Sequence, residues 1–168
     1  MRYVRQAGSD PSFLLKALGE SSGDLRRSID GLSRIELLRT GEGFDEDWCL
    51  LAIAVHLRDT EEGILEQVEA ILSGREPEIR HVDLDDIPLP DVYRDADEDR
   101  VLDEFQFYRR HTTYTLWDLP ERHWERAGLH PYRGKLTIME IAREAYQHDL
   151  EHLWQARRML DAMTRPGR

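Results

Sequence analysis

The C-terminal part of the chain carries its most restrictive pattern, a long stripe of apolar residues at helical spacing. Between residues 137 and 163, apolar side chains recur at steps of three and four, at Ile138, Ile141, Ala142, Ala145, Ala156, Met159, Leu160 and Met163. This spacing is typical of the core-facing side of an α-helix with a 3.6-residue period. The stripe therefore predicts an amphipathic helix with one buried face.

Three polar residues, His148, Asp149 and His152, fall inside this apolar stripe. At about 100° per residue, they lie on the face that the pattern assigns to burial. A buried polar group without a partner costs roughly 1–3 kcal/mol, and a buried charge costs more. We therefore expect something to satisfy these three side chains.

Three other long segments also have helical periodicity. The first begins after Asp10, which is a favourable N-cap followed by proline, and the stretch "ESSG" weakens its middle. The second spans about residues 47–72 and is apolar nearly all round in "CLLAIAVHL", so we expect it to be deeply buried. The third spans roughly residues 97–119.

The remaining segments connect these helices. Residues 73–95 are acidic and rich in proline and show no helical period, and such long connections usually cross a fold or border a site. Pro120 opens a short predicted helix, "PERHWERAG", closed by Gly128, and Thr137 with Glu140 forms a capping box that starts the last helix. No strand alternation of useful length occurs. We predict an all-α four-helix bundle that forms a single domain, residues 1–168.

The composition excludes several classes of protein. One cysteine in 168 residues excludes an internal disulfide framework. No signal peptide is visible and no apolar run approaches the ~18 residues of a membrane span, so we expect a soluble, cytoplasmic protein without a membrane partner. The net charge of −11 argues against a nucleic-acid partner. Arginine pairs such as Arg109–Arg110 have acidic neighbours, and we interpret them as solvated helix faces.

The histidines inside the helical stripe have the spacing of metal ligands. His148 and His152 are four residues apart, so both imidazoles lie on one helix face and can reach a single ion. His56 is the natural third ligand, because it is the only strongly polar residue in "CLLAIAVHL" and lies near the middle of its helix. Asp59 and Asp149 are candidates for a further ligand, for an acceptor that fixes a ring tautomer, or for a general base.

Three neutral histidines leave a divalent ion with at least one open coordination position. Structural zinc sites usually have four protein ligands, so an open site favours Lewis-acid chemistry on a bound water or thiol. We expect metal affinity to fall below pH ~6.5, where an unperturbed histidine becomes protonated. The remaining histidines are weaker candidates in loops or on the surface, at His81, His111, His123 and His130.

Two segments of the chain resemble a known family. "AVHLRDTEEGILEQV", which contains His56, and "WERAGLHPYRGKLTIMEIAREAYQHDLEHLWQ", which contains His148 and His152, are similar to the DinB/YfiT-like superfamily of bacterial stress-associated proteins. The resemblance covers most of the chain from residue 48 onward and is most specific over residues 124–155.

The resemblance has consequences for fold, metal and assembly. It implies a four-helix bundle in up-down-down-up order, in which residues 73–95 form the long crossover between parallel second and third helices. It implies a divalent ion, nickel or zinc, held by His56, His148 and His152. It also implies a homodimer, which the unusually broad apolar surface of the second helix would favour. Members are not generally DNA binders.

Three functions fit these expectations. The first is a metal-dependent S-transferase that acts in stress or detoxification, with a low-molecular-weight thiol and an electrophile as partners, as in the characterised branches that the chain resembles. The second is a metal-dependent hydrolase with Asp59 or Asp149 as general base. The third is a non-catalytic metal-binding stress protein.

Overall fold

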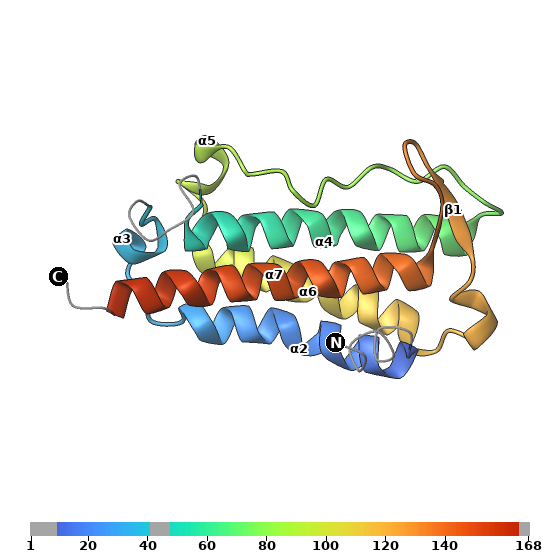
Figure 1. Ribbon diagram of the computed structural model, residues 1–168, viewed down its shortest axis with the longest axis horizontal. Coiled ribbons are helices and arrows are strands. Elements are labelled where there is room, and N and C mark those ends of the chain that lie inside the picture. The colour runs from blue at the N-terminus through green and yellow to red at the C-terminus, as the bar shows by residue number, and fades with distance from the viewer. Residues whose placement is uncertain (1–9, 41–47, 165–168) are drawn as a thin grey trace.

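The protein consists mainly of four long helices. Its structure is a computed structural model that describes residues 10–40 and 48–164. The helices are α2 (Pro11–Ile29), α4 (Leu50–Ser73), α6 (Glu98–Trp117) and α7 (Ile138–Thr164). α2 and α7 run in one direction and α4 and α6 in the other, which is up-down-down-up order (Figure 1). α2 and α4 each pack against both α6 and α7. The predicted four-helix bundle is confirmed.

Side-chain caps fix the starts of these helices. The carboxylate of Asp10 accepts a hydrogen bond from the backbone N–H of Ser12, at 2.9 Å, as its N-cap position predicts. Thr137 and Glu140 form the predicted capping box at the start of α7. The predicted start of the second helix near residue 47 lies outside the described residues, and α4 begins after Cys49.

The crossover between α4 and α6 runs back along α4 and is largely irregular, as predicted (Figure 1). It contains one short helix, α5 (Pro90–Tyr93). Its middle approaches α4 closely at Gly63, where a Cβ atom would lie only 2.7 Å from Cγ2 of Val82. The absence of a side chain at Gly63 is therefore what lets the crossover lie against the helix.

A β-hairpin between α6 and α7 differs from the predicted loop. Strands β1 (Ala127–His130) and β2 (Gly134–Thr137) pair antiparallel, and Gly134 takes a positive φ of 75° at the turn. β1 also joins the crossover, since the N–H of Ile79 donates to the carbonyl of Leu129 at 3.1 Å. Strands of four residues are too short for sequence alternation to predict. The helix predicted before α7 is only the 3₁₀ turn η1 (Glu121–His123), and Gly128 lies in β1 instead of closing it.

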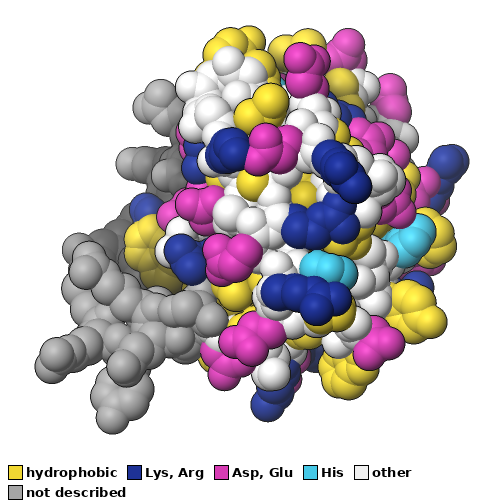
Figure 2. Space-filling model, turned by 90° about the vertical axis from the view of Figure 1, so that its right-hand side faces the viewer, with side chains coloured by type: hydrophobic (Ala, Val, Ile, Leu, Met, Phe, Trp, Pro, Cys, Tyr) yellow, Lys and Arg dark blue, Asp and Glu magenta, His cyan; other side chains and the backbone are white. Residues whose placement is uncertain are grey.

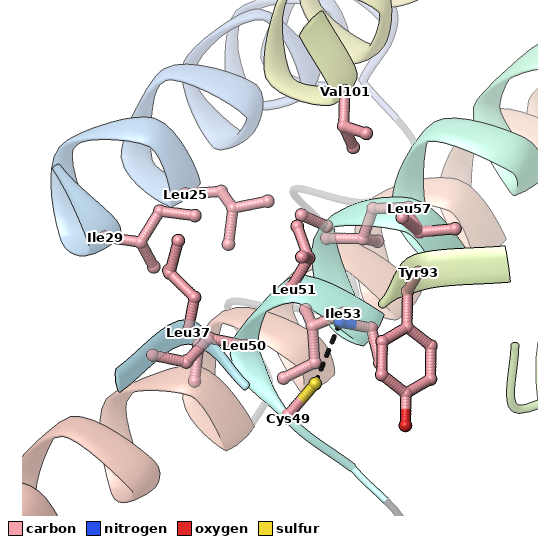
Figure 3. Packing of buried hydrophobic residues seen from close by; sticks show 14 of the residues in the cluster. Leu25, Ile29, Leu37, Cys49, Leu50, Leu51, Ile53, Leu57, Tyr93 and Val101 are labelled. Atoms are coloured by element: carbon pink, nitrogen blue, oxygen red, sulfur yellow. Dashed lines mark hydrogen bonds between the residues drawn. The ribbon is translucent and has the colours of Figure 1, made fainter. Parts of the chain in front are cut away.

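The apolar first half of α4 is buried within the bundle. Cys49 and all residues from 50 to 57 are at most 3 % exposed. They pack against residues of α2, the short helix α3 (Arg34–Leu37), α5 and α6, among them Leu25, Ile29, Leu37, Tyr93 and Val101 (Figure 3). The broad apolar surface of this helix is thus buried within the same chain and gives no support to the predicted homodimer. The homodimer stays a prediction.

A buried ion-pair cluster crosses the middle of the bundle. Arg109 of α6 is only 1 % exposed, so its interpretation as part of a solvated helix face was wrong. Its guanidinium pairs with both carboxylate oxygens of Asp149 on α7 and lies 2.8 Å from Oε2 of Glu61 on α4. It also donates to the hydroxyl of Ser21 on α2, at 2.8 Å. The predicted weak point "ESSG" therefore lies inside an unbroken α2, where it supplies Ser21 to this cluster.

The surface at the hairpin end of the bundle is mixed in charge. Figure 2 shows acidic, basic and hydrophobic side chains interspersed on this face. Several of the charges form ion pairs there, such as Lys135 with Glu76 and Arg133 with Glu144. Among the described residues, none of the helices combines the length and apolar character that crossing a membrane requires.

The close approach at Gly63 generates a stability prediction. Gly63→Ala should destabilise the protein by about 1–3 kcal/mol, because the new methyl group overlaps Val82 and displaces the crossover. The matched control is Gly19→Ala in α2, where a Cβ meets no atom within 4 Å. That change should stabilise by about 0.5–1 kcal/mol through helix propensity. Urea unfolding of both variants measures the difference, and equal effects would show that the crossover does not pack tightly on α4.

Candidate metal centre

Three histidines from two helices converge in the middle of the bundle. One ring nitrogen from each of His56, His148 and His152 lies within 4.8 Å of the other two. His56 projects from α4 and the other two from successive turns of α7. The ring centroids are 4.5–4.8 Å apart. The structure therefore brings together the three residues that the sequence singled out as metal ligands.

Burial keeps these imidazoles neutral. Loss of solvent lowers the pKa of His56 to about 4 and that of His148 to about 3, and it also lowers the pKa of His152. The backbone of Leu84 in the crossover acts in the opposite direction on His56 and His148, but the burial effect is larger. A metal ligand must be the neutral imidazole, so the lowered pKa values extend the binding-competent form below the pH of ~6.5 expected from sequence.

Hydrogen bonding also leaves nitrogen lone pairs for a ligand. Nδ1 of His152 lies 2.8 Å from Oε1 of Gln155, which can only accept, so Nδ1 carries the proton and Nε2 has a free lone pair. Nε2 of His56 and Nε2 of His148 face each other at 2.7 Å. Two such nitrogens need either a shared proton or a shared cation between them. A buried set of neutral nitrogen donors with this arrangement fits a divalent transition-metal ion.

Two further residues complete the surroundings of the histidines, and sequence reasoning missed both. The indole of Trp48 lies 5.3 Å from the ring of His56 and 5.1 Å from that of His152. Gln155 fixes the tautomer of His152, and its position one helical turn after that histidine is a signal that could have identified it. Trp48 precedes the apolar run of α4 and had no comparable signal.

A cleft between α4 and the crossover gives access to His56. Its volume is about 480 Å³, within the range of roughly 300–1,000 Å³ that is usual for small-molecule sites. Its lining includes the carboxylates of Asp59, Asp83 and Asp86. It also includes apolar side chains of the crossover, namely Ile87, Pro88, Leu89 and Val92. A small molecule in this cleft would therefore meet both polar and apolar surface beside one of the histidines.

The two candidate aspartates lie in different environments. Asp59 lines the cleft with His56 and is half-exposed, and Arg58 lies 2.6 Å from its carboxylate. Partial burial raises the pKa of Asp59, while Arg58 acts in the opposite direction. Asp149 is fully buried, and both of its oxygens bind Arg109. Asp149 is therefore part of the ion-pair cluster. A general base must be accessible to substrate or water, and Asp149 is not.

The other histidines lie outside this group of three. His111 is exposed and His123 is half-buried in η1. His130 is buried in β1 and makes a separate pair with His81 of the crossover, Nε2 to Nδ1, at 3.1 Å. The sequence predicted separate loops for His81 and His130, because it gave no signal for the hairpin that brings them together.

Removal of one histidine tests the site directly. His148→Ala should weaken zinc binding by more than the ~10–100-fold that is typical for loss of an outer-shell partner, while the apolar seams keep the bundle folded. The measurement is zinc content by mass spectrometry after dialysis, with circular dichroism as a check on folding. His123→Ala is the control and should retain full zinc content. Equal zinc content in both variants would contradict the site.

The lowered histidine pKa values also predict how stability depends on pH. In the metal-free protein the unfolded chain binds more protons than the folded one, between the folded pKa values of about 3 and 4 and the unfolded value of ~6.5. The free energy of unfolding should therefore decrease as the pH falls through this window. Urea unfolding at about pH 7 and about pH 5 measures the decrease. His148→Gln should decrease less than the unaltered protein, and an equal decrease would contradict burial of a neutral His148.

Comparison with known proteins identifies the fold. No protein-family model matches the sequence, and no curated protein matches it. Among solved structures the chain is similar to YfiT from Bacillus subtilis, described as a probable metal-dependent hydrolase with an unusual four-helix bundle topology. The TM-score is 0.79 at 19 % identity, and the match covers 91 % of this chain and 87 % of that one. The chain therefore has the fold of YfiT, and its resemblance to the DinB/YfiT-like superfamily is confirmed at the level of the fold.

Proposed function

We propose that this protein is a divalent-metal-dependent hydrolase, in which His56, His148 and His152 hold the ion and Asp59 acts as general base. The proposal rests mainly on one observation, that Asp59 and His56 line the same cleft from neighbouring turns of α4. YfiT, whose fold the chain shares, is described as a probable metal-dependent hydrolase, which supports the same class of reaction.

The histidines suit such an ion because they are neutral and fixed in place. Burial keeps the three imidazoles uncharged, so they leave the positive charge of nickel or zinc undiminished. When bound, the ion would lower the pKa of a water or thiol and polarise a carbonyl or phosphoryl oxygen of the substrate. Gln155 holds the ring of His152, and Trp48 packs against two of the rings, so the donors are preorganised.

Asp59 would handle protons at the mouth of the site. Its carboxylate is half-exposed in the cleft and accepts a hydrogen bond from Nε of Arg58 at 2.7 Å, which holds its position. It would take a proton from the attacking water and later return it to the leaving group. The raised pKa of Asp59 makes it a stronger base than an ordinary aspartate.

The thiol S-transferase remains a second candidate. Its distinguishing support is the apolar part of the cleft lining, Ile87, Pro88, Leu89 and Val92, which would accommodate an apolar electrophile. The same three histidines would serve, with a low-molecular-weight thiol in place of water. A thiol that is already ionised needs no general base, so this mechanism would make Asp59 dispensable. A cytoplasmic location fits either reaction and stays part of the proposal.

Replacement of Asp59 separates the two mechanisms. For a hydrolase, Asp59→Asn should lower kcat by about 10²–10⁴-fold without loss of bound zinc, since a general base contributes a factor of this size. Glu62→Gln is the control on an exposed position of the same helix and should leave kcat unchanged. An Asp59→Asn variant with full activity would exclude Asp59 as the base.

The reaction class is tested with two probes on the zinc-loaded protein and on the same protein after EDTA treatment. The hydrolase proposal expects zinc-dependent cleavage of p-nitrophenyl acetate that needs no thiol. Consumption of 1-chloro-2,4-dinitrobenzene only in the presence of both zinc and glutathione would instead support the S-transferase and overturn the hydrolase. If the protein binds zinc but turns over neither probe, the non-catalytic metal-binding protein predicted from sequence takes their place.

A further inference from the structure

The buried cluster of Glu61, Arg109 and Asp149 has no role in the mechanism above. All three side chains are at most 2 % exposed, and two carboxyl groups share a single guanidinium. Ion pairs as deeply buried as this are weak contributors to stability, because desolvation offsets much of the attraction between the charges. Replacement by apolar residues of similar volume is often neutral or stabilising. Stability alone therefore does not account for the cluster.

The position of the cluster relative to the histidines offers an account. Asp149 directly follows His148 and precedes His152 by three residues on α7, and Glu61 lies five residues after His56 on α4. Each helix that carries a histidine of the metal centre thus also carries one carboxylate of the cluster. Arg109 on α6 donates hydrogen bonds to Asp149 and forms an ion pair with Glu61 at 2.8 Å, so a single guanidinium connects the two helices.

The contacts restrict rotation of α7 about its axis. Arg109 engages both oxygens of Asp149, and Ser21 of α2 donates to the same carboxylate. A shift of α7 by a single residue would turn the helix by about 100° and carry His148 away from His56. Such a shift would also break every bond to Asp149. On α4, Thr112 binds the second oxygen of Glu61 at 2.6 Å and fixes that helix in the same way.

We propose that Glu61, Arg109 and Asp149 are positioning residues of the metal centre, which hold α4 and α7 in the rotation at which His56, His148 and His152 share one ion. The inference rests on the metal binding proposed above and adds a function for three residues that touch no ligand. This role explains why the core contains charged residues where apolar residues would also fit. Directional bonds specify one rotation of a helix more sharply than apolar packing does.

The test compares a fully apolar cluster with the natural one. The triple variant Glu61→Leu/Arg109→Met/Asp149→Val leaves no unpaired charge, and both neighbouring hydroxyls keep partners, Ser21 with the carbonyl of Leu18 and Thr112 with that of Tyr108. It should therefore fold, as checked by its thermal unfolding. Its affinity for Co²⁺ should fall by about 10–100-fold, the usual effect of removing outer-shell support. The visible spectrum of bound Co²⁺ should change as well, since it reports the geometry of the ligands.

Two controls separate positioning from other effects. Arg26→Met/Asp103→Leu removes an ion pair between α2 and α6, whose two residues lie on neither α4 nor α7, and it should retain the unaltered affinity. Glu61→Gln removes one charge but keeps an oxygen for Arg109, while Thr112 can accept from the amide, so its affinity should stay within a few-fold. If Glu61→Gln weakens binding as much as the triple variant does, the cluster acts through its charge and the positioning role is wrong.

The outcomes also distinguish this inference from the proposed function. A folded triple variant with unaltered Co²⁺ affinity and spectrum would overturn the positioning role and leave the metal centre intact. If the unaltered protein itself binds no Co²⁺, the proposed function fails, and the positioning role fails with it. If the triple variant does not fold, the single variant Arg109→Lys replaces it. Arg109→Lys keeps the charge but loses the bidentate bond to Asp149, so lower Co²⁺ affinity supports positioning and unchanged affinity contradicts it.

Discussion

The guanidinium of Arg109 is the point at which all four long helices of this protein meet. It extends from α6 to carboxylates on α4 and α7 and to the hydroxyl and backbone of α2. A charge in the core must be paired there, because an isolated one would cost far more than a folded domain can spare. The need to pair Arg109 therefore constrains the rotation of every helix in the bundle, and through it the positions of the histidines.

The three histidines of the candidate metal centre lack enough hydrogen-bond partners of their own. Three neutral imidazoles in a core have few hydrogen-bond partners, and the two facing nitrogens of His56 and His148 satisfy each other only in part. Burial lowers the pKa values of all three rings, so protonation cannot relieve the site near neutral pH. A cation would satisfy the lone pairs at once. The burial that leaves these nitrogens short of partners would thus also favour a metal ion over protons as their ligand.

The sequence predicted the parts of this structure that follow from periodicity and missed those that need tertiary contacts. The apolar stripes and caps predicted four helices, and polar residues inside a stripe predicted the convergence of His56, His148 and His152. Arg109 was misplaced because its neighbours in sequence are acidic, whereas its partners lie 40 or more residues away. The hairpin was missed because four residues carry too little alternation. The excess of apolar residues on α4 predicted an interface, but α3 and α5, short helices with weak sequence signals, cover it instead.

X-ray absorption spectroscopy of the zinc-loaded protein shows whether three histidines from two helices hold one divalent ion. We expect about one zinc per chain, with three imidazole nitrogens at about 2.0–2.1 Å and the multiple-scattering pattern that imidazole rings produce. The remaining coordination should come from light atoms supplied by solvent. A zinc shell made only of oxygen, or one that contains fewer than two imidazoles, would contradict the proposed site.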